Sequence, residues 1–258
     1  MKKILVFENT HILTNHLIKE WMRIADESIE MHGRFCAALS GGRSPVEFYC
    51  KLSGLRDLES WAKTHIFLAD ERFVPLDNKD SNFGMIKNNF LNFLDIPLEN
   101  IHPIPTSEEN VLVAAEEYKK TLLRFFPLKN NPIPRFDFIL LGLGEDGHTA
   151  SLYPQDNNVD DPNRIVLPVS LPHLKEERIS LTLSVINNAR YIFFLAQGKK
   201  KASIIKKVME EKYSTPAAKV ESPQGQLTFL LDKEAAAEFS YLDSPLVTHH
   251  LEAVEIPI

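Results

Sequence analysis

Residues 136–154 read FDFILLGLGEDGHTASLYP, and this stretch decides the fold. Residues 136–141 are apolar except for Asp137, which predicts a strand buried on both faces, as in a parallel sheet. Glycines at 142, 144 and 147 follow, and His148 comes next, at the edge of a short helical pattern. Because open α/β sheets bind ligands beyond the carboxyl ends of their strands, this loop is a candidate active site.

Other apolar runs alternate with helical patterns on both sides of this stretch. The predicted strands are 3–8, 35–39, 64–69, 165–169, 178–183, 191–196 and 227–231. Predicted helices end at Gly33, begin at Ser44, Ser81 and Gly198, and cover 107–126 and 232–239. The alternation predicts a doubly wound, mostly parallel α/β sheet of Rossmann-like type, with helices on both faces. We expect a single domain over 1–243 and assign no role to the tail, 244–258.

The composition is that of an ordinary globular protein, with 258 residues, 44% hydrophobic and 25% charged. No apolar run reaches the roughly 18 residues of a membrane span, and the first residues form a strand pattern, not a signal peptide. We therefore expect a cytoplasmic protein. The net charge of −6 argues against nucleic acid as a partner but allows an anionic small molecule in a cationic cleft. Cys36 and Cys50 are interpreted as buried thiols, not a disulfide.

A second glycine loop, SGGRSP at 40–45, follows the predicted strand 35–39. Ser44, Pro45 and Glu47 are the residue types of a capping box, which predicts a helix start at Ser44. The N–H groups and positive dipole end of that helix would favour a phosphate. The alternative is a plain strand-to-helix turn that needs glycine for its geometry alone.

Charged residues also follow two other predicted strands. Residues 70–72, DER, come directly after the strand 64–69, in a loop where catalytic groups often lie in this architecture. Residues 199–201, KKK, open a helix after the strand 191–196, where a lysine can reach into the same crevice. For both segments the alternative is a solvated surface turn or helix end.

Taken in order, these loops resemble the 6-phosphogluconolactonases, which form one larger group with the glucosamine-6-phosphate isomerases. The matching segments are LSGGRSP at 39–45, DERFVP at 70–75, SN at 81–82, GLGEDGHTASLYP at 142–154 and, more weakly, RISLT at 178–182, GKKKA at 198–202 and PAA at 216–218. The resemblance covers roughly residues 1 to 243. It implies hydrolysis of 6-phospho-D-glucono-1,5-lactone to 6-phosphogluconate in the oxidative pentose phosphate pathway, with no metal or organic cofactor. We expect a monomer.

The resemblance also implies roles for individual residues. His148 is the expected general base, because imidazole titrates near neutral pH, and Asp146 is expected to orient it. Arg72 is expected at the oxyanion or the substrate hydroxyls, helped by backbone N–H groups of the 142–147 loop. Asp70 is a site residue that positions water or a hydroxyl, or supports the loop. The residues expected to bind the substrate and its phosphate are Gly41, Gly42, Arg43, Ser44, Gly144, Arg178 and Lys201.

Two other functions stay open. A glucosamine-6-phosphate isomerase would share the scaffold, but the isomerases usually carry glutamate where Tyr153 stands and tyrosine in place of Arg72, so both positions favour the lactonase. A non-catalytic sugar-phosphate-binding regulator would need only the phosphate site, and the presence of His148 and Asp146 argues against it. A NAD-binding Rossmann protein is excluded because no G-x-G-x-x-G follows the first strand.

Overall fold

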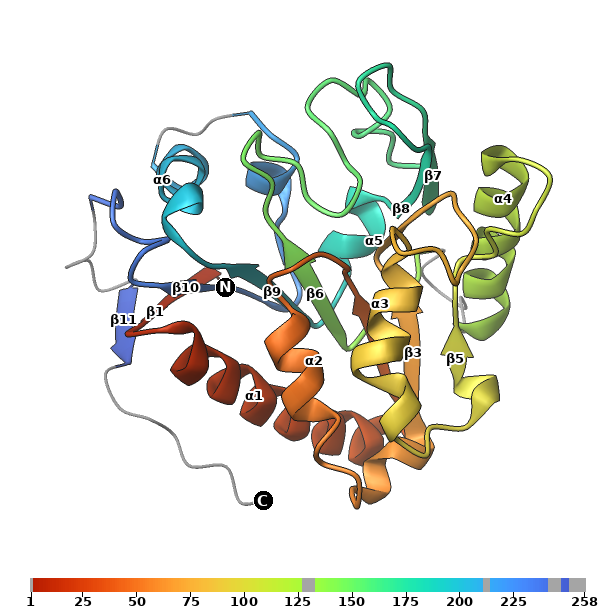
Figure 1. Cartoon of the computed structure of the whole chain (residues 1–258), viewed down its shortest axis with the longest axis horizontal. Coiled ribbons are helices and arrows are strands. Elements are labelled where there is room, and N and C mark those ends of the chain that lie inside the picture. The colour runs from red at the N-terminus through yellow and green to blue at the C-terminus, as the bar shows by residue number, and fades with distance from the viewer. Residues whose placement is uncertain (1, 127–132, 211–213, 241–246, 251–258) are drawn as a thin grey trace.

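The computed structural model describes residues 2–126, 133–210, 214–240 and 247–250. Within these ranges the chain forms an 8-stranded sheet with the order β11-β1-β10-β9-β6-β2-β3-β5 (Figure 1). All of its strand pairs are parallel. Its strands are β1 (Lys2–Phe7), β2 (Phe35–Leu39), β3 (Thr64–Leu68), β5 (Ile101–His102), β6 (Phe138–Gly142), β9 (Tyr191–Ala196), β10 (Gln226–Asp232) and β11 (Val247–His250).

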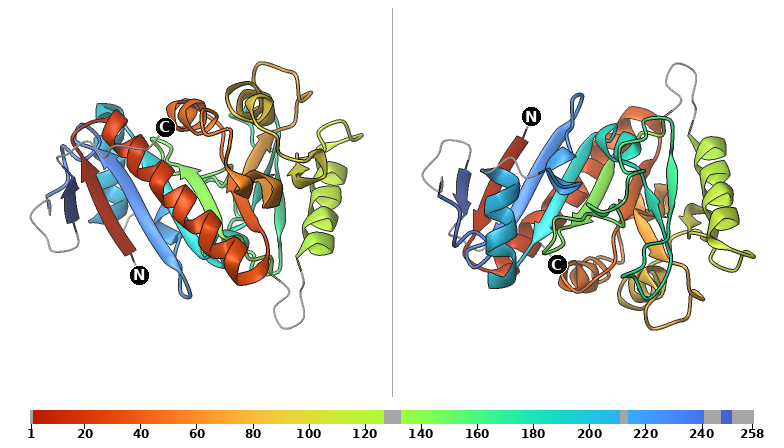
Figure 2. Two further views of the ribbon diagram at one scale, coloured as in Figure 1. Left: turned by 90° about the horizontal axis from the view of Figure 1, so that it is seen from below. Right: turned by 90° about the horizontal axis from the view of Figure 1, so that it is seen from above.

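Helices cover both faces of this sheet, which confirms the predicted fold class. Seen from below and from above, α1 and α6 lie on opposite faces (Figure 2). The helices are α1 (Thr10–His32), α2 (Val46–Leu52), α3 (Asn82–Asn89), α4 (Val111–Phe125), α5 (Leu183–Asn187) and α6 (Ala202–Met209). Strand β6 lies in the middle of the sheet, and Phe138–Leu141 are buried on both faces as expected from their apolar run.

Helix α1 shows how the local sequence fixes the packing. Asn9 caps its start by accepting a hydrogen bond from the Ile12 N–H group, and Gly33 ends it in the left-handed conformation, φ 82°. Between these caps, apolar residues at helical spacing bury one face against the sheet, with Leu17 and Trp21 among the most buried. The predicted end at Gly33 is confirmed.

A second, 3-stranded antiparallel sheet with the order β4-β8-β7 forms one wall above the main sheet. Its strands are β4 (Asp70–Arg72), β8 (Arg178–Leu181) and β7 (Val166–Val169). The prediction of a loop at 70–72 was wrong, because this segment pairs with β8 and places Arg72 opposite Arg178. Since strand side chains alternate, Asp70, Arg72 and Arg178 share one face. The Glu71 side chain lies on the opposite face of this sheet.

The buried Glu71 carboxylate holds the start of α3. It accepts hydrogen bonds from the N–H groups of Arg72, Asn82 and Phe83 and from the Ser81 hydroxyl. Burial raises its pKa in spite of these bonds. Ser81 also caps α3 by accepting from the Gly84 N–H group, which confirms the predicted helix start.

Three other local predictions were wrong. Helix α2 begins at Val46 without a capping box: Pro45 is its N-cap, no side chain accepts there, and the Glu47 carboxylate pairs with Lys51 instead. Residues 233–238 form turns and no helix, although Asp232 does cap the first turn by accepting from the Ala235 N–H group. Cys36 is buried, but Cys50 is exposed; both thiols are free.

Part of the predicted tail belongs to the sheet. β11 pairs in parallel with β1, in the register Ile4↔Val247 to Phe7↔His250. The rest of the tail, 244–246 and 251–258, lies outside the described residues. Across the described ranges, no helix combines the length and the apolar character that a bilayer crossing requires.

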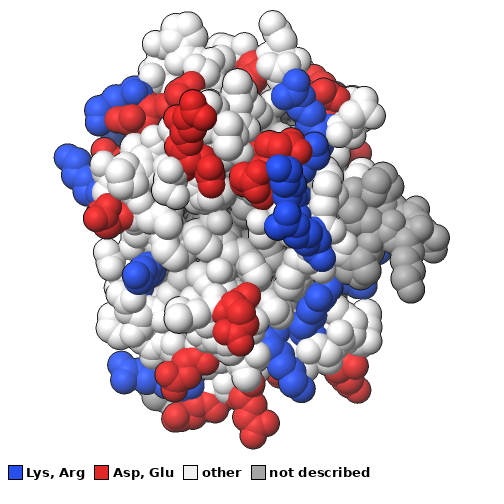
Figure 3. Space-filling model, turned by 90° about the vertical axis from the view of Figure 1, so that its right-hand side faces the viewer, with Lys and Arg blue, Asp and Glu red and all other residues white. Residues whose placement is uncertain are grey.

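The face that carries α4 shows acidic and basic side chains intermixed (Figure 3). Along α4 these charges pair locally, with Lys119 Nζ 3.1 Å from Glu116 and Lys120 Nζ 2.7 Å from Glu117. Such exposed pairs contribute little to stability and create no uniform basic surface here.

Two histidines lie side by side where β3 pairs with β5. The ring nitrogens of His65 and His102 are 3.4 Å apart, and the His102 ring stacks on Phe67 with 4.2 Å between centroids. Burial lowers the pKa of His102 to about 4 and also lowers that of His65. The folded protein therefore holds both rings neutral under conditions where the unfolded chain would bind protons.

We predict that His102→Phe reduces the acid sensitivity of the fold. Because the pKa is depressed in the folded state, stability is fully present above 6.5 and is lost as pH falls from 6.5 towards 4. Phenylalanine keeps the stack on Phe67 but removes the titrating group. Thermal melts across this range should show a shallower fall in Tm than wild type, whereas a substitution of the exposed His173 to phenylalanine should leave the slope unchanged. An unaltered slope for His102→Phe would contradict the assignment.

Candidate active site

A pocket of about 870 Å³ opens beyond the carboxyl ends of β2, β6 and β9. Its walls come from the loops after these strands and from the exposed face of β4 and β8. Every residue singled out from the sequence lines it: Gly41, Gly42, Arg43, Ser44, Asp70, Arg72, Gly144, Asp146, His148, Arg178 and Lys201. The topology thus brings together loops that are more than a hundred residues apart along the chain.

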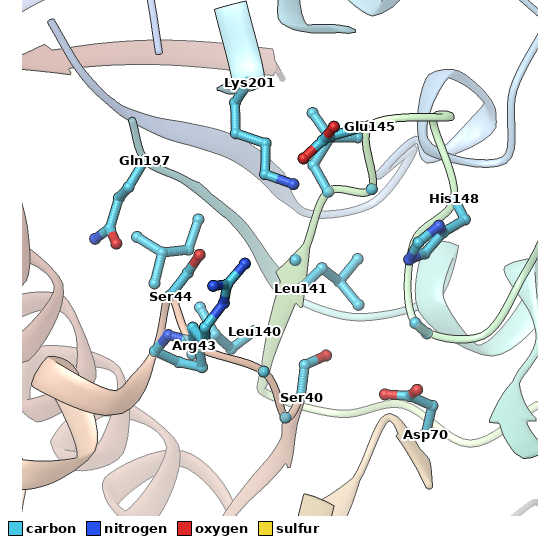
Figure 4. A pocket seen from close by; sticks show the side chains of 18 of the residues that line it. Ser40, Arg43, Ser44, Asp70, Leu140, Leu141, Glu145, His148, Gln197 and Lys201 are labelled. Carbon is cyan, nitrogen blue, oxygen red and sulfur yellow. The ribbon is translucent and has the colours of Figure 1, made fainter. Parts of the chain in front are cut away.

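His148 and Asp146 form a hydrogen-bonded pair on one wall of the pocket (Figure 4 shows the His148 ring directed inward). His148 Nδ1 lies 2.6 Å from Asp146 Oδ1, and the same oxygen accepts from the His148 N–H group at 3.1 Å. These bonds hold the pKa of Asp146 down to about 2, so the carboxyl is ionised at neutral pH. An ionised acceptor at Nδ1 fixes the proton there and leaves the lone pair on Nε2.

Gly144 is required by this pair. A Cβ at position 144 would lie 2.2 Å from His148 Nδ1 and 2.6 Å from Asp146 Oδ1, closer than any real contact. The Gly144 N–H group donates to the His148 carbonyl, and the Gly147 N–H group donates to the Gly144 carbonyl. With the His148 N–H group already bonded to Asp146, these three donors serve the loop itself. The Gly144 and Gly147 N–H groups are therefore engaged within the loop and are not free oxyanion donors in this structure.

The His148 loop is supported from behind and from the side. Gly147, at φ 86°, has the Thr215 side chain packed where its Cβ would be, and its carbonyl accepts from the Ala217 N–H group at 3.1 Å. The PAA segment of the sequence therefore supports the loop from outside the pocket. On the other side, the Tyr153 ring lies 4.6 Å from the His148 ring, is 5% exposed, and has its pKa raised by burial.

Asp70 lies across the pocket from His148 and is 5% exposed. Its Oδ2 accepts from the Ser151 hydroxyl at 2.6 Å, and its Oδ1 accepts from Asn82 Nδ2 at 3.3 Å. Ser151 reaches it from a tight turn in which Ala150 adopts φ 47°, an uncommon conformation for a residue with a side chain. Sequence reasoning missed Ser151, although it lies only three residues after His148.

Six cationic residues line the pocket: Arg43, Arg72, Arg178, Lys199, Lys200 and Lys201. The Arg72 Nη1 donates to the Asp80 carbonyl at 2.6 Å, while the Nε atoms of Arg72 and Arg178 are buried without a partner. Lys201 and Arg43 extend from opposite loops toward one part of the pocket (Figure 4). Burial lowers the pKa of Lys201, and nearby Glu145 raises it less. Two neutral residues that received no role from the sequence also line the pocket: Ser40, the first residue of the SGGRSP segment, and Gln197.

Metal ligation has little basis in this part of the chain. Among the described residues no three histidine, cysteine, aspartate or glutamate side chains come together as a metal-binding group would. The pocket instead combines one imidazole–carboxylate pair, two separate carboxylates, Asp70 and Glu145, and several cations. This arrangement suits proton transfer on an anionic ligand.

Comparison with known proteins agrees with this site. The model of the family described as glucosamine-6-phosphate isomerases/6-phosphogluconolactonase matches residues 8–229. The chain is 36% identical over 217 residues to a 6-phosphogluconolactonase of Nostoc sp., covering 83% of this chain and 89% of the relative. It is 31% identical over 251 residues to one of Chlamydia pneumoniae, covering 94% and 93%. The chain therefore belongs to the glucosamine-6-phosphate isomerase/6-phosphogluconolactonase family, as its motifs predicted.

A solved structure shows the same fold. The 6-phosphogluconolactonase from Trypanosoma brucei matches with a TM-score of 0.82 at 29% identity, covering 93% of this chain and 99% of that one. The agreement extends over nearly the whole of both chains.

We predict that Gly144→Ala breaks the imidazole–carboxylate pair without unfolding the protein. The added methyl group would overlap His148 Nδ1 and must displace that ring or the Asp146 carboxylate. The ¹⁵N resonances of the His148 ring should then lose the signature of a fixed Nδ1–H tautomer. Gly142→Ala is the matched control, because a Cβ there meets no atom within 4 Å. Identical spectra for Gly144→Ala and wild type would show that the pair does not need this glycine.

Proposed function

We propose that this protein is a 6-phosphogluconolactonase, which hydrolyses 6-phospho-D-glucono-1,5-lactone to 6-phosphogluconate in the oxidative pentose phosphate pathway. The observation that carries the proposal is the His148–Asp146 pair, 2.6 Å apart, directed into a pocket lined by cations. Its support is the family membership and the relatives of that name over most of the chain. A lactone ester needs a base for water, a stabilised oxyanion and a proton for the leaving oxygen, and the site holds groups for each.

In the proposed reaction, His148 Nε2 removes a proton from water as the water oxygen bonds to the lactone carbonyl carbon. The carbonyl oxygen takes up the electron pair as an oxyanion near the Arg72 guanidinium. When the carbonyl reforms, the bond to the ring oxygen breaks, and the imidazolium returns its proton to that oxygen. Ionised Asp146 stabilises the imidazolium between these steps and holds its tautomer. The new carboxylic acid then releases a proton to solvent.

We place the phosphate on the turn of residues 41–44, with Lys201 and Arg178 as its cationic partners and Arg43 as an auxiliary one. Gly42 adopts φ 92°, which lets this turn present its backbone to the pocket. Because α2 begins only at Val46, the turn itself and the side chains supply most of the attraction. Asp70 is assigned to water or hydroxyl positioning, since lactone hydrolysis needs no proton moved between carbons.

The rival activity is aldose–ketose isomerisation of glucosamine 6-phosphate. The buried Tyr153 ring beside His148 favours the lactonase, because the isomerases usually carry glutamate there. The two activities separate in one experiment: loss of lactone above the spontaneous rate, and ammonia release from glucosamine 6-phosphate. Acceleration of lactone loss alone supports the proposal, and ammonia release overturns it. Binding of phosphate esters without either reaction would point to a regulator.

We predict that His148→Ala lowers kcat for lactone hydrolysis by roughly 10²–10⁴-fold, the usual contribution of a positioned general base. Its KM should change little, since phosphate binding does not involve the imidazole. The lactone is generated in place by glucose-6-phosphate dehydrogenase, and its loss is followed against a blank. His173→Ala serves as the control, because His173 contacts the far side of Tyr153 and not the pocket. Wild-type turnover of His148→Ala would exclude the mechanism.

We predict that phosphate-ester affinity falls at alkaline pH because of Lys201. Burial lowers the pKa of this lysine from 10.5, so it loses its charge at a lower pH than a free lysine does. The inhibition constant of 6-phosphogluconate should therefore rise between neutral pH and about pH 10. Lys201→Arg should flatten that rise, since arginine stays protonated. Parallel pH curves for the two proteins would remove Lys201 from the phosphate site.

We further propose that residues 1–243 fold as one domain, to which the tail adds the edge strand β11, and that the protein is a cytoplasmic monomer. The family match over 8–229 and the intermixed charges of the α4 face support these proposals. Light scattering coupled to size exclusion would measure the mass directly; a value near 29.4 kDa is expected for a monomer.

A further inference from the structure

Most of the buried side-chain polar atoms that lack a hydrogen-bond partner, within the described chain, belong to residues that line the pocket. They are Ser40 Oγ, Arg72 Nε, Asn82 Oδ1, Arg178 Nε and Gln197 Nε2. Native proteins leave few such atoms unbonded, because each costs about 1–3 kcal/mol of desolvation. Their concentration at one site indicates a ligand that supplies the missing partners. The two guanidinium atoms suit an anion, but Ser40 and Asn82 are neutral and need another explanation.

Ser40 is held rigidly with its hydroxyl unbonded. It follows β2, is 5% exposed, and its carbonyl accepts a hydrogen bond from the buried Tyr49 hydroxyl at 2.7 Å. The backbone is therefore fixed by α2 while Ser40 Oγ lacks a partner. Figure 4 shows this oxygen turned toward the Asp70 carboxylate across the pocket, apart from Arg43 and Lys201.

Asn82 is fixed just as firmly. Its Nδ2 donates to the Asp70 carbonyl at 2.9 Å and to the Asp70 carboxylate, so the amide cannot rotate freely. Its Oδ1 packs against Gly41, where a Cβ would come within 1.9 Å of it. Gly41 is thus needed to make room for the amide, and Asn82 Oδ1 remains a buried acceptor without a donor.

Asp70 completes the group with an unsatisfied charge. Its two bonds come from the neutral donors Ser151 and Asn82, and no ion pair of its carboxylate occurs among the described residues. An ionised carboxylate has about four lone-pair positions, so capacity to accept is left over. This negative charge disfavours an anion here, and Arg72 on the same strand disfavours a cation. A neutral hydroxyl, which both donates and accepts, meets all three residues.

We propose that Ser40, Asp70 and Asn82 form a hydroxyl-recognition subsite, which binds secondary hydroxyls of the sugar between its phosphate and its carbonyl carbon. A ligand hydroxyl accepts from Ser40 or donates to Asp70 or Asn82. The cations anchor the phosphate, whereas this subsite selects polyhydroxylated ligands over deoxygenated ones of the same charge. The orientation of the ligand rests on the proposed function; the hydroxyl preference rests on the unpartnered atoms.

The test measures, by calorimetry, the affinity of wild type and of each variant for a set of related ligands. The probes are 6-phosphogluconate and its 2-deoxy, 3-deoxy and 4-deoxy analogues. Wild type is expected to bind at least one analogue roughly 3- to 30-fold more weakly, the cost of one neutral hydrogen bond and an unpaired buried group. Ser40→Ala should weaken the parent ligand by a similar factor but bind one deoxy analogue as well as wild type does, because both partners are then absent.

Ser44→Ala is the matched control, since it removes a hydroxyl from the proposed phosphate turn and should weaken all four ligands equally. If wild type binds every deoxy analogue as tightly as the parent, the subsite is overturned without recourse to any variant. An equal loss for all ligands in Ser40→Ala would overturn the role of Ser40. Lactone turnover of the wild type is measured separately: hydrolysis without hydroxyl discrimination rejects the subsite alone, and discrimination without hydrolysis rejects the proposed function alone.

Discussion

The hydrogen bond from the Ser151 hydroxyl to the Asp70 carboxylate, 2.6 Å long and buried at both ends, joins the two halves of the pocket. One half is the loop after β6, which carries His148; the other is the small antiparallel sheet, which carries Arg72 and Arg178. The Ser151 N–H group also donates to the hydroxyl of Ser180, the residue opposite Asp70. These bonds tie the loop that carries His148 to the small sheet that carries the two guanidinium groups.

The pocket also shows how an acidic chain can hold a cationic cleft. The net charge is −6, yet six cationic residues line the pocket against three acidic ones, Asp70, Glu145 and Asp146. Asp146 is bonded to the imidazole, and Asp70 accepts from two neutral donors. The cations are left with free donors, as the unpartnered Nε atoms of Arg72 and Arg178 show. Local arrangement therefore outweighs total charge. Close range and partial burial make these few interactions stronger than the more distant field of the surface carboxylates.

The parallel sheet, the Gly-rich loops and the imidazole pair could be predicted from the sequence, because they depend on local signals. These signals are buried apolar runs, glycines, and two residues that lie two positions apart in one loop. The sequence did not reveal that residues 70–72 form a strand, since three charged residues lack any strand pattern and pair only because β8 lies beside them. Nor could it assign Ser151, an ordinary residue type inside a quoted motif, because its hydroxyl bonds to Asp70, which is 81 residues away along the chain. The capping box predicted at Ser44 does not form, because the Glu47 carboxylate forms an ion pair with Lys51.

Tyr153 connects the geometry of the base to the choice between the two chemistries of the family. Its buried ring covers one side of the His148 imidazole, with the ring centres 4.6 Å apart. A glutamate at this position would bring a second carboxylate to the imidazole and favour its charged, acidic form. The tyrosine excludes that charge and leaves Asp146 as the carboxylate bonded at Nδ1. In the tautomer that this bond fixes, Nε2 carries the lone pair, which the proposed removal of a proton from water requires.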